Sequence, residues 1–312
     1  MPLWNPYIFS GTPLQANPQS GIFYPLGQLF YFLPVQIAFK LWLFVHLFLL
    51  FVGTYILFKL LLKDTLSSVI AATAFVFSSC IIYLIPAGHI VFLAGLSWFP
   101  FVLFMLLKVY ALHSPVFPAI IVSLILAGQF LSGHPQSVFL TLICGFLLFC
   151  WTKFKRGREL LIVIGVFAAL SAVQLLPSME LSPLTERGGW KTLTGAYSLE
   201  LRNLVSLIFP NYAGNPVNGS YQFPVSYFFE KEKLFFGILP LFLAIYGLVR
   251  FGRGKGEVGR GFYFLLLVIA GLLLSFGMNA PFYKLLHNAL PFFAFFRTPS
   301  RFYALALIGL CY

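Results

Sequence analysis

The sequence has few charged residues, and very few of these are acidic. Charged side chains make up 9% of the 312 residues, with 8 Asp and Glu against 20 Lys and Arg, whereas 60% of the residues are hydrophobic. A soluble protein of this length does not have enough polar side chains in such a composition to cover its surface. The composition therefore predicts an all-α protein, a polytopic bundle of transmembrane helices that forms a single domain over residues 1–312.

Cysteine is also scarce, and its spacing excludes two classes of site. The four cysteines lie in apolar runs without a CxxC spacing, which argues against a disulfide framework and against a zinc site. We interpret them as buried thiols. No HExxH or other tight ligand spacing is present either, so the sequence predicts no metal site and leaves open whether a divalent cation is a cofactor. The cysteines are Cys80, Cys144, Cys150 and Cys311.

The net charge of +12 does not indicate a nucleic-acid partner, because the basic residues are not interleaved with stacking aromatics. They fall instead in short clusters between apolar runs, which is typical of loops on the cytoplasmic side of a membrane. Eleven of them are assigned to that face, so the longer polar loops are expected outside. The eleven are Lys59, Lys63, Lys108, Lys153, Lys155, Arg156, Arg158, Arg250, Arg253, Lys255 and Arg260.

Apolar runs long enough for membrane helices alternate with these loops. Several are nearer sixteen residues than the roughly 20 that an upright helix needs, so their predicted ends are approximate. The predicted spans are 41–62, 65–85, 91–108, 116–132, 137–152, 160–176, 234–250, 261–277 and a ninth that begins at Phe302. A long outer loop is expected over 177–233, after six spans in 41–176 and before two spans and part of a third in 234–312.

The first forty residues contain six prolines and no acidic residue, and they lack the basic start of a signal peptide. Pro25 and Pro34 interrupt their apolar run, which favours an outer loop with an interfacial or re-entrant helix over 1–40. Neutral hydrogen-bonding groups beside aromatic rings are typical of carbohydrate contacts and equally of an interfacial aromatic belt. The candidate substrate-binding residues here are Trp4, Asn5, Gln15, Asn17 and Gln19.

Three polar side chains follow three successive outward spans at nearly equal steps. His134 lies 45 residues after His89, and Glu180 lies 46 residues after His134. Two histidines and a carboxylate at one mouth would suit metal binding or proton transfer. The alternative is that hairpins of equal length simply repeat their interfacial polar residues. Glu180 and His134 are the catalytic candidates, with His89 and Gln136 as substrate-binding candidates.

Two arginines lie four positions apart just before the last predicted span. Guanidinium groups bind phosphate oxygens in a bidentate way, so Arg297 and Arg301 could hold the phosphate of a lipid carrier. Anchoring to lipid headgroups, or a salt bridge to one of the glutamates, explains the pair equally well.

Several motifs occur in a characteristic order: PLWNPYIFSGTPLQANPQSGIFYPL, a Gly-His pair, SGHPQ, VQLLPSMEL and FFRTPSRF. Together they resemble the YfhO-type bacterial membrane proteins, polytopic glycosyltransferases of GT-C architecture, over essentially the whole chain. The resemblance implies transfer of a sugar from a polyprenyl-phosphate-linked donor to a cell-envelope polymer or lipid, outside the bacterial cytoplasmic membrane.

The chain departs from this family in one respect. Such enzymes place a catalytic Asp or Glu in the first outer loop, whereas no acidic residue precedes Asp64 here. We therefore expect the chain to be a fragment that lacks the first helix and this residue. Glu180 or His134 could then assist the general base, and Arg297 with Arg301 the departing phosphate. The rival hypotheses are a transporter or flippase of lipid-linked precursors and a non-catalytic assembly subunit.

Overall fold

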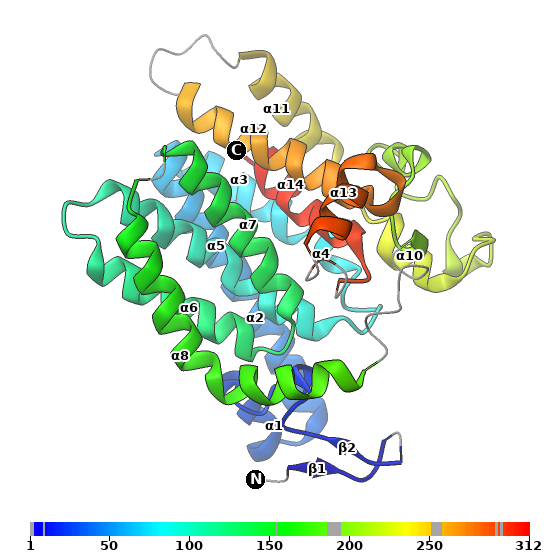
Figure 1. Ribbon diagram of the computed structural model, residues 1–312. Coiled ribbons are helices and arrows are strands. Elements are labelled where there is room, and N and C mark those ends of the chain that lie inside the picture. Colours follow the sequence, from blue (N-terminus) through cyan, green and yellow to red (C-terminus); the bar gives the residue numbers. More distant parts are fainter. Residues whose placement is uncertain are drawn as a thin grey trace. The chain divides into compact units, whose positions relative to one another are not determined.

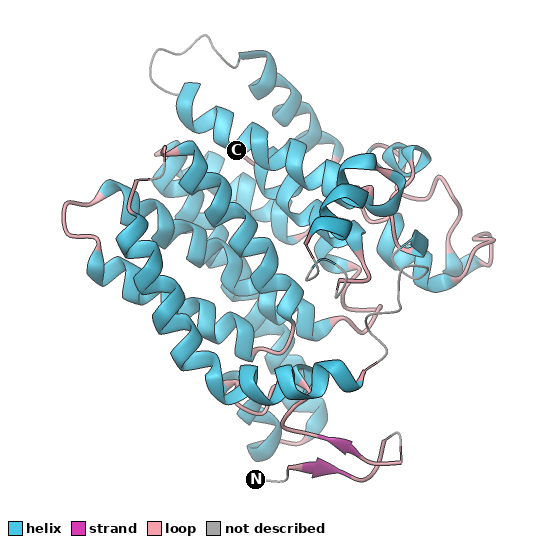
Figure 2. Cartoon of the chain, viewed as in Figure 1, coloured by secondary structure: helices cyan, strands magenta, loops and turns pink. Residues whose placement is uncertain are grey.

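The computed structural model describes residues 3–8, 10–153, 155–185, 195–250, 258–290, 293 and 296–312. Helices make up most of the described chain, and two very short strands near the N-terminus are the exception (Figure 2). The predicted all-α architecture is therefore confirmed for the described residues, whereas the GT-C arrangement stays a prediction. By chain contacts the protein divides into two compact units, unit 1 with Met1–Leu57 and Ile90–Thr185, and unit 2 with Phe58–His89 and Glu186–Tyr312.

Unit 1 is a bundle of long helices preceded by an irregular segment. Its elements are β1 (Trp4–Asn5), β2 (Thr12–Pro13), η1 (Pro18–Ser20), η2 (Pro25–Gln28), α1 (Leu29–Phe32), most of α2 (Val35–Leu62), α5 (Ile90–Ala111), α6 (Val116–Leu131), α7 (Pro135–Trp151), α8 (Gly157–Leu181) and η3 (Ser182–Leu184). Helix α6 packs along both α5 and α8 (Figure 1).

Buried polar side chains join three of these helices. The Gln129 side-chain amide donates to the Gly95 carbonyl at 3.0 Å and to the Thr141 hydroxyl at 2.9 Å. Gly95 also lets α7 approach closely, since a Cβ there would collide with Ser137. Small residues and satisfied amides are what holds helices together where both the helix surface and its surroundings are apolar.

A series of hydrogen bonds attaches the irregular N-terminal segment to the bundle. The Tyr24 hydroxyl lies 2.8 Å from His46 Nε2 and accepts from the Trp98 indole at 2.8 Å. His46 Nδ1 lies 2.6 Å from the Trp42 carbonyl, so this nitrogen carries the proton and Nε2 accepts from Tyr24. Both ring nitrogens of the buried His46 are thus used within the protein, which is a structural role.

Unit 2 combines shorter helices with the polar-aromatic segment. Its elements are α3 (Thr65–Val76), α4 (Ser79–Ile82), η5 (Leu201–Leu207), η6 (Pro216–Asn218), α10 (Val225–Lys231), α11 (Ile238–Arg250), α12 (Val258–Ser275), η7 (Gly277–Asn279), α13 (Pro281–Ala289), η9 (Pro299–Phe302) and α14 (Tyr303–Leu310). Helices α12 and α14 pack side by side, with Gly271 of α12 at their contact (Figure 1). A Cβ on Gly271 would collide with the Ala306 backbone.

Several span ends differ from the prediction. Helix α2 begins at Val35 rather than at 41, and the expected span 65–85 divides into α3 and α4. Helix α8 continues through Pro177 to Leu181, so the polar segment starts later than 177. Three helical stretches in the described chain are long and apolar enough to cross a membrane: Val35–Leu62, Ile90–Ala111 and Gly157–Leu184.

Candidate functional site

Four consecutive charged residues are buried in unit 2. The run from Glu230 to Lys233 ends helix α10, and aromatic pairs flank it on both sides in the sequence. Each of the four side chains is buried. A buried charge is strongly unfavourable unless it is paired and hydrogen-bonded, so the partners of this run define the site.

Glu230 is the centre of the site. Its Oε1 accepts from Arg301 Nη2 at 2.6 Å, and its Oε2 lies 2.8 Å from the ammonium of Lys233. His89 Nε2 lies 2.9 Å from Oε1. Burial alone would raise the pKa of the Glu230 carboxyl, but the charges of Arg301 and Lys233 and the hydrogen bonds from His89 and Arg301 outweigh burial and hold this pKa well below its ordinary value.

The geometry fixes the tautomer of His89. An ionised carboxylate can only accept, so Nε2 must carry the proton that it shares with Glu230. In the neutral ring, Nδ1 then holds a lone pair. Gly88, at φ 72, ends the preceding turn in a left-handed conformation, and the His89 side chain remains 33% exposed. The imidazole is therefore oriented by a buried carboxylate and still reachable from outside.

A second ion group lies beside the first in the sequence. The ammonium of Lys231 is 2.8 Å from Glu200 Oε1, and Arg202 Nε is 2.9 Å from Glu200 Oε2. Glu200 also caps η5 in a reciprocal pair with Asn203. The hydrogen bond from Lys231 lowers the pKa of the Glu200 carboxyl. One carboxylate thus holds two cations at the start of η5.

Glu232 is in the opposite electrostatic situation to Glu230. Its Oε1 accepts from Asn203 Nδ2 at 2.8 Å, and no described cation forms a salt bridge with it. Burial raises the pKa of the Glu232 carboxyl. Two glutamates, two positions apart, are therefore shifted in opposite directions, which is the arrangement found where acid–base roles are divided between carboxyls.

No protein-family model, curated protein or solved structure matches this chain. Among the described residues, no three His, Cys, Asp or Glu side chains are grouped so that they could hold a metal ion.

The structure brings two of the predicted site residues together. His89 and Arg301 both bind Glu230, so Arg301 makes the glutamate salt bridge that was the alternative to phosphate binding. Its side chain is buried, whereas that of Arg297 is exposed. Arg301 is therefore a support of the site, and Arg297 remains the candidate for phosphate.

The two catalytic candidates, His134 and Glu180, lie in unit 1 together with the substrate-binding candidate Gln136. His134 precedes the first turn of α7, with its ring edge-on to Phe92 at 4.8 Å between centroids. Gln136 is buried in that turn. Glu180 is exposed in the last turn of α8. These side chains keep the predicted position at helix ends, and nothing in unit 1 tests their predicted roles.

The N-terminal candidates make mainly local hydrogen bonds. Asn17 Oδ1 accepts from the Gln19 backbone at 3.0 Å, and Asn5 Oδ1 accepts from Tyr7 in the same way at 3.0 Å. Gln15 donates to the Val173 carbonyl of α8 at 3.4 Å. Trp4 lies in β1 and is exposed. The amides of this segment thus shape it and attach it to α8.

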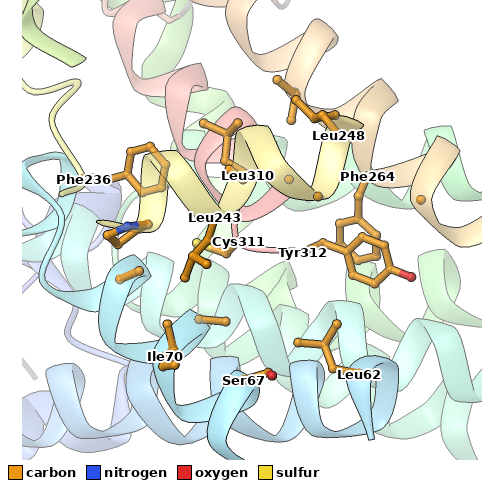
Figure 3. Close-up of a pocket in the computed structure, with 18 of the residues that line it drawn as sticks. Leu62, Ser67, Ile70, Phe236, Leu243, Leu248, Phe264, Leu310, Cys311 and Tyr312 are labelled. Atoms are coloured by element: carbon orange, nitrogen blue, oxygen red, sulfur yellow. The ribbon is translucent and has the colours of Figure 1, made fainter. Parts of the chain in front are cut away.

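An apolar cavity of about 590 Å³ is also present in unit 2, between parts of α3, α11, α12 and the end of α14 (Figure 3). Ile70 and Leu243 point toward one another across it. The described residues that line it include no carboxylate, imidazole or basic group. They offer no group for acid–base chemistry, so the polar site is the one with catalytic potential.

Sequence reasoning did not single out Glu230, Glu232 or Lys233. A signal was available, because Phe-Phe-Glu-Lys-Glu-Lys-Leu-Phe-Phe places four charges between aromatic pairs in a chain with only 9% charged residues. Charges enclosed by large apolar side chains are seldom left to solvent. Such a run predicts buried ion pairs, although not their partners.

Proposed function

We propose that this chain forms part of an integral membrane glycosyltransferase. It would move a sugar from a polyprenyl-phosphate-linked donor to a cell-envelope acceptor on the extracytoplasmic face of a bacterial cytoplasmic membrane. The observation that carries the proposal is the 2.9 Å contact between His89 Nε2 and the buried Glu230 carboxylate, which leaves Nδ1 of an accessible imidazole as a proton acceptor. The apolar helices and basic short loops support the membrane setting.

Transfer needs one base and one stabilised leaving group. The acceptor hydroxyl oxygen forms a bond to the anomeric carbon of the sugar, and its proton passes to His89 Nδ1. The bond from that carbon to the carrier phosphate breaks, and the phosphate leaves with the electron pair. Glu230 stabilises the imidazolium that forms, as the carboxylate of a catalytic triad does. Arg297, exposed in the loop before η9, is the candidate for the departing phosphate.

Arg301 and Lys233 keep Glu230 ionised. Without their charges the buried carboxyl would take up a proton and could no longer accept from Nε2. Because both cations bind the carboxylate, Glu230 stays an acceptor and holds the imidazole in one orientation. The ion group thus prepares His89 and does not touch the reacting atoms.

The test is His89→Gln, assayed in membranes with a polyprenyl-phosphate sugar. Glutamine keeps an N–H donor for Glu230 but has no ring nitrogen to accept a proton, so we expect transfer to fall by about 100-fold or more. His113→Gln, at an exposed histidine before α6, is the matched control and should leave transfer unchanged. Equal transfer by a folded His89→Gln protein would exclude His89 as the base and favour a non-catalytic subunit.

A further inference from the structure

A second, polar cavity lies in unit 2, in the segment that precedes and includes the charged run. Its volume is about 500 Å³, within the range of small-molecule sites. Amide, hydroxyl and aromatic side chains line it, among them Asn211, Tyr212, Ser220, Gln222 and Phe223. Glu232 completes the wall. The cavity lies near the Glu230 site, since Cα atoms two positions apart are at most about 7 Å from each other.

Glu232 presents one carboxyl oxygen to this cavity. The residue is only 4% exposed, and Oε1 accepts from Asn203. For Oε2 the structure gives no hydrogen-bond partner among the described residues. Oε2 is not among the buried side-chain atoms that lack a partner, so it is accessible from the cavity, where a ligand hydroxyl can donate to it. A carboxyl group held by Asn203 through one oxygen and open to the cavity through the other points to a hydrogen-bonding ligand.

The aromatic rings leave faces available beside these polar groups. Tyr212 is 59% exposed and Phe223 is 40% exposed. The Arg202 guanidinium lies over the Phe223 ring at 4.7 Å, which fixes one side of that ring. Rings that are held in place and exposed next to hydrogen-bonding groups offer an apolar face and polar edges to one ligand.

The charges indicate which ligand chemistry fits. Among the residues that the structure describes, Arg202 is the only cation that lines the cavity, and its Nε is 2.9 Å from Glu200. A phosphate would need guanidinium or ammonium groups that are not already committed to carboxylates. The wall instead offers hydroxyl, amide and carboxyl groups, which exchange hydrogen bonds with alcohols.

We infer that this cavity binds an uncharged saccharide unit, with ring faces on Tyr212 and Phe223 and hydroxyls on Gln222, Asn211 and Glu232. That the bound sugar takes part in transfer rests on the proposed function, whereas sugar binding itself does not. Binding is measured without turnover, so a failure to bind and a failure to transfer are distinguishable.

Saturation-transfer NMR on the protein in lipid nanodiscs tests this without competing sugar detergents. The probes are D-glucose, D-galactose, N-acetyl-D-glucosamine and D-glucose 1-phosphate. We expect at least one uncharged sugar to bind, with affinity about five- to tenfold weaker in Tyr212→Ala and in Gln222→Ala. Phe209→Ala, at an exposed ring of the same segment that does not line the cavity, should bind like the unchanged protein.

Two outcomes would overturn the inference. One is binding of no uncharged sugar, or of the phosphorylated sugar alone. The other is equal loss in Phe209→Ala and Tyr212→Ala. Both variants replace exposed side chains, and a thermal unfolding measurement on each shows whether it is folded. If the sugars bind as expected while His89→Gln transfers normally, the cavity is a saccharide site and the proposed base is wrong.

Discussion

Glu230 binds three donors from separate parts of the sequence: His89, Lys233 and Arg301. The carboxylate and its two cations carry a net charge of +1 when the imidazole is neutral, counting one negative against two positive groups. Both cations attract the carboxylate and repel each other, so removal of Glu230 would leave two uncompensated buried cations, whereas removal of one cation costs the carboxylate hydrogen bonds. The stability of unit 2 therefore depends on all of the partners together.

We expect Arg301→Met to cost about 1.5–3 kcal/mol of unfolding free energy, because the buried Glu230 carboxylate loses the hydrogen bonds from the guanidinium while Lys233 still balances its charge. Arg202→Met removes a half-exposed guanidinium from Glu200 and should cost at most about 1 kcal/mol. Denaturant unfolding of both variants in the same lipid or detergent gives the comparison. Similar costs for the two would mean that burial does not set the strength of the Arg301 pair.

The two glutamates should give stability opposite pH dependences. The Glu230 pKa is lowered below its ordinary value of 4.5, so its contribution is present above that value and is lost as pH falls through the lower, folded pKa. The Glu232 pKa is raised, so its ionisation destabilises the fold as pH rises above 4.5. At pH 7, Glu230→Gln should therefore destabilise the protein and Glu232→Gln should stabilise it.

Unfolding measured from about pH 4 to pH 7 checks this pair. The stabilisation by Glu232→Gln should shrink toward pH 4, where the natural carboxyl is already protonated in both states. If both variants shift stability in the same direction at pH 7, the carboxyls of Glu230 and Glu232 do not lie in opposite electrostatic environments.

At the scale of elements, helices were predictable and their ends were not. Apolar runs gave the positions of α5, α6 and α7 within a few residues, because a long apolar segment has few alternatives to a helix. The break between α3 and α4 falls at Phe77 and Ser78, where no glycine or proline marks it. It depends on a contact with a distant segment, since Ser79 donates its backbone N–H to the Phe235 carbonyl.

Close packing of α12 on α14 depends on glycine. We expect Gly271→Ala to cost about 1–3 kcal/mol, since its Cβ would collide with the Ala306 backbone of the neighbouring helix. Gly165→Ala in α8 is the matched control, because no atom lies near its Cβ. Higher helix propensity should make that change neutral or stabilising by about 0.5–1 kcal/mol. Thermal unfolding of the two variants measures the difference, and an equal shift would contradict the packing argument.

For the whole molecule, composition and charge distribution predicted a helical, apolar chain, but the site needed three-dimensional information. Unit 2 is assembled from two stretches of sequence separated by the helices of unit 1. His89 and Arg301 were recognised from their local sequence, whereas their common partner was not. Pairing between residues far apart in sequence leaves no periodic pattern, so Glu230 could not be assigned as their partner beforehand.

Sidedness is the whole-molecule prediction. In a variant with its four cysteines replaced by serine, Val217→Cys should react with a membrane-impermeant maleimide on intact cells, since Val217 is 94% exposed in the segment predicted to be outside. Lys153→Cys, in a basic loop, should react only after permeabilisation. Reaction of Lys153→Cys on intact cells would contradict the predicted topology.

The charges alternate from Glu230 to Lys233, and this alternation restricts how the length of the segment can change during evolution. If the chain were displaced by one position, Lys231 would face the cations that now bind Glu230, and attraction would become repulsion. Insertions or deletions of one residue should therefore be excluded from these four positions, while the loop around Val217 can vary in length. The alternating charges of these four residues therefore fix the register in which the segment pairs with its partners.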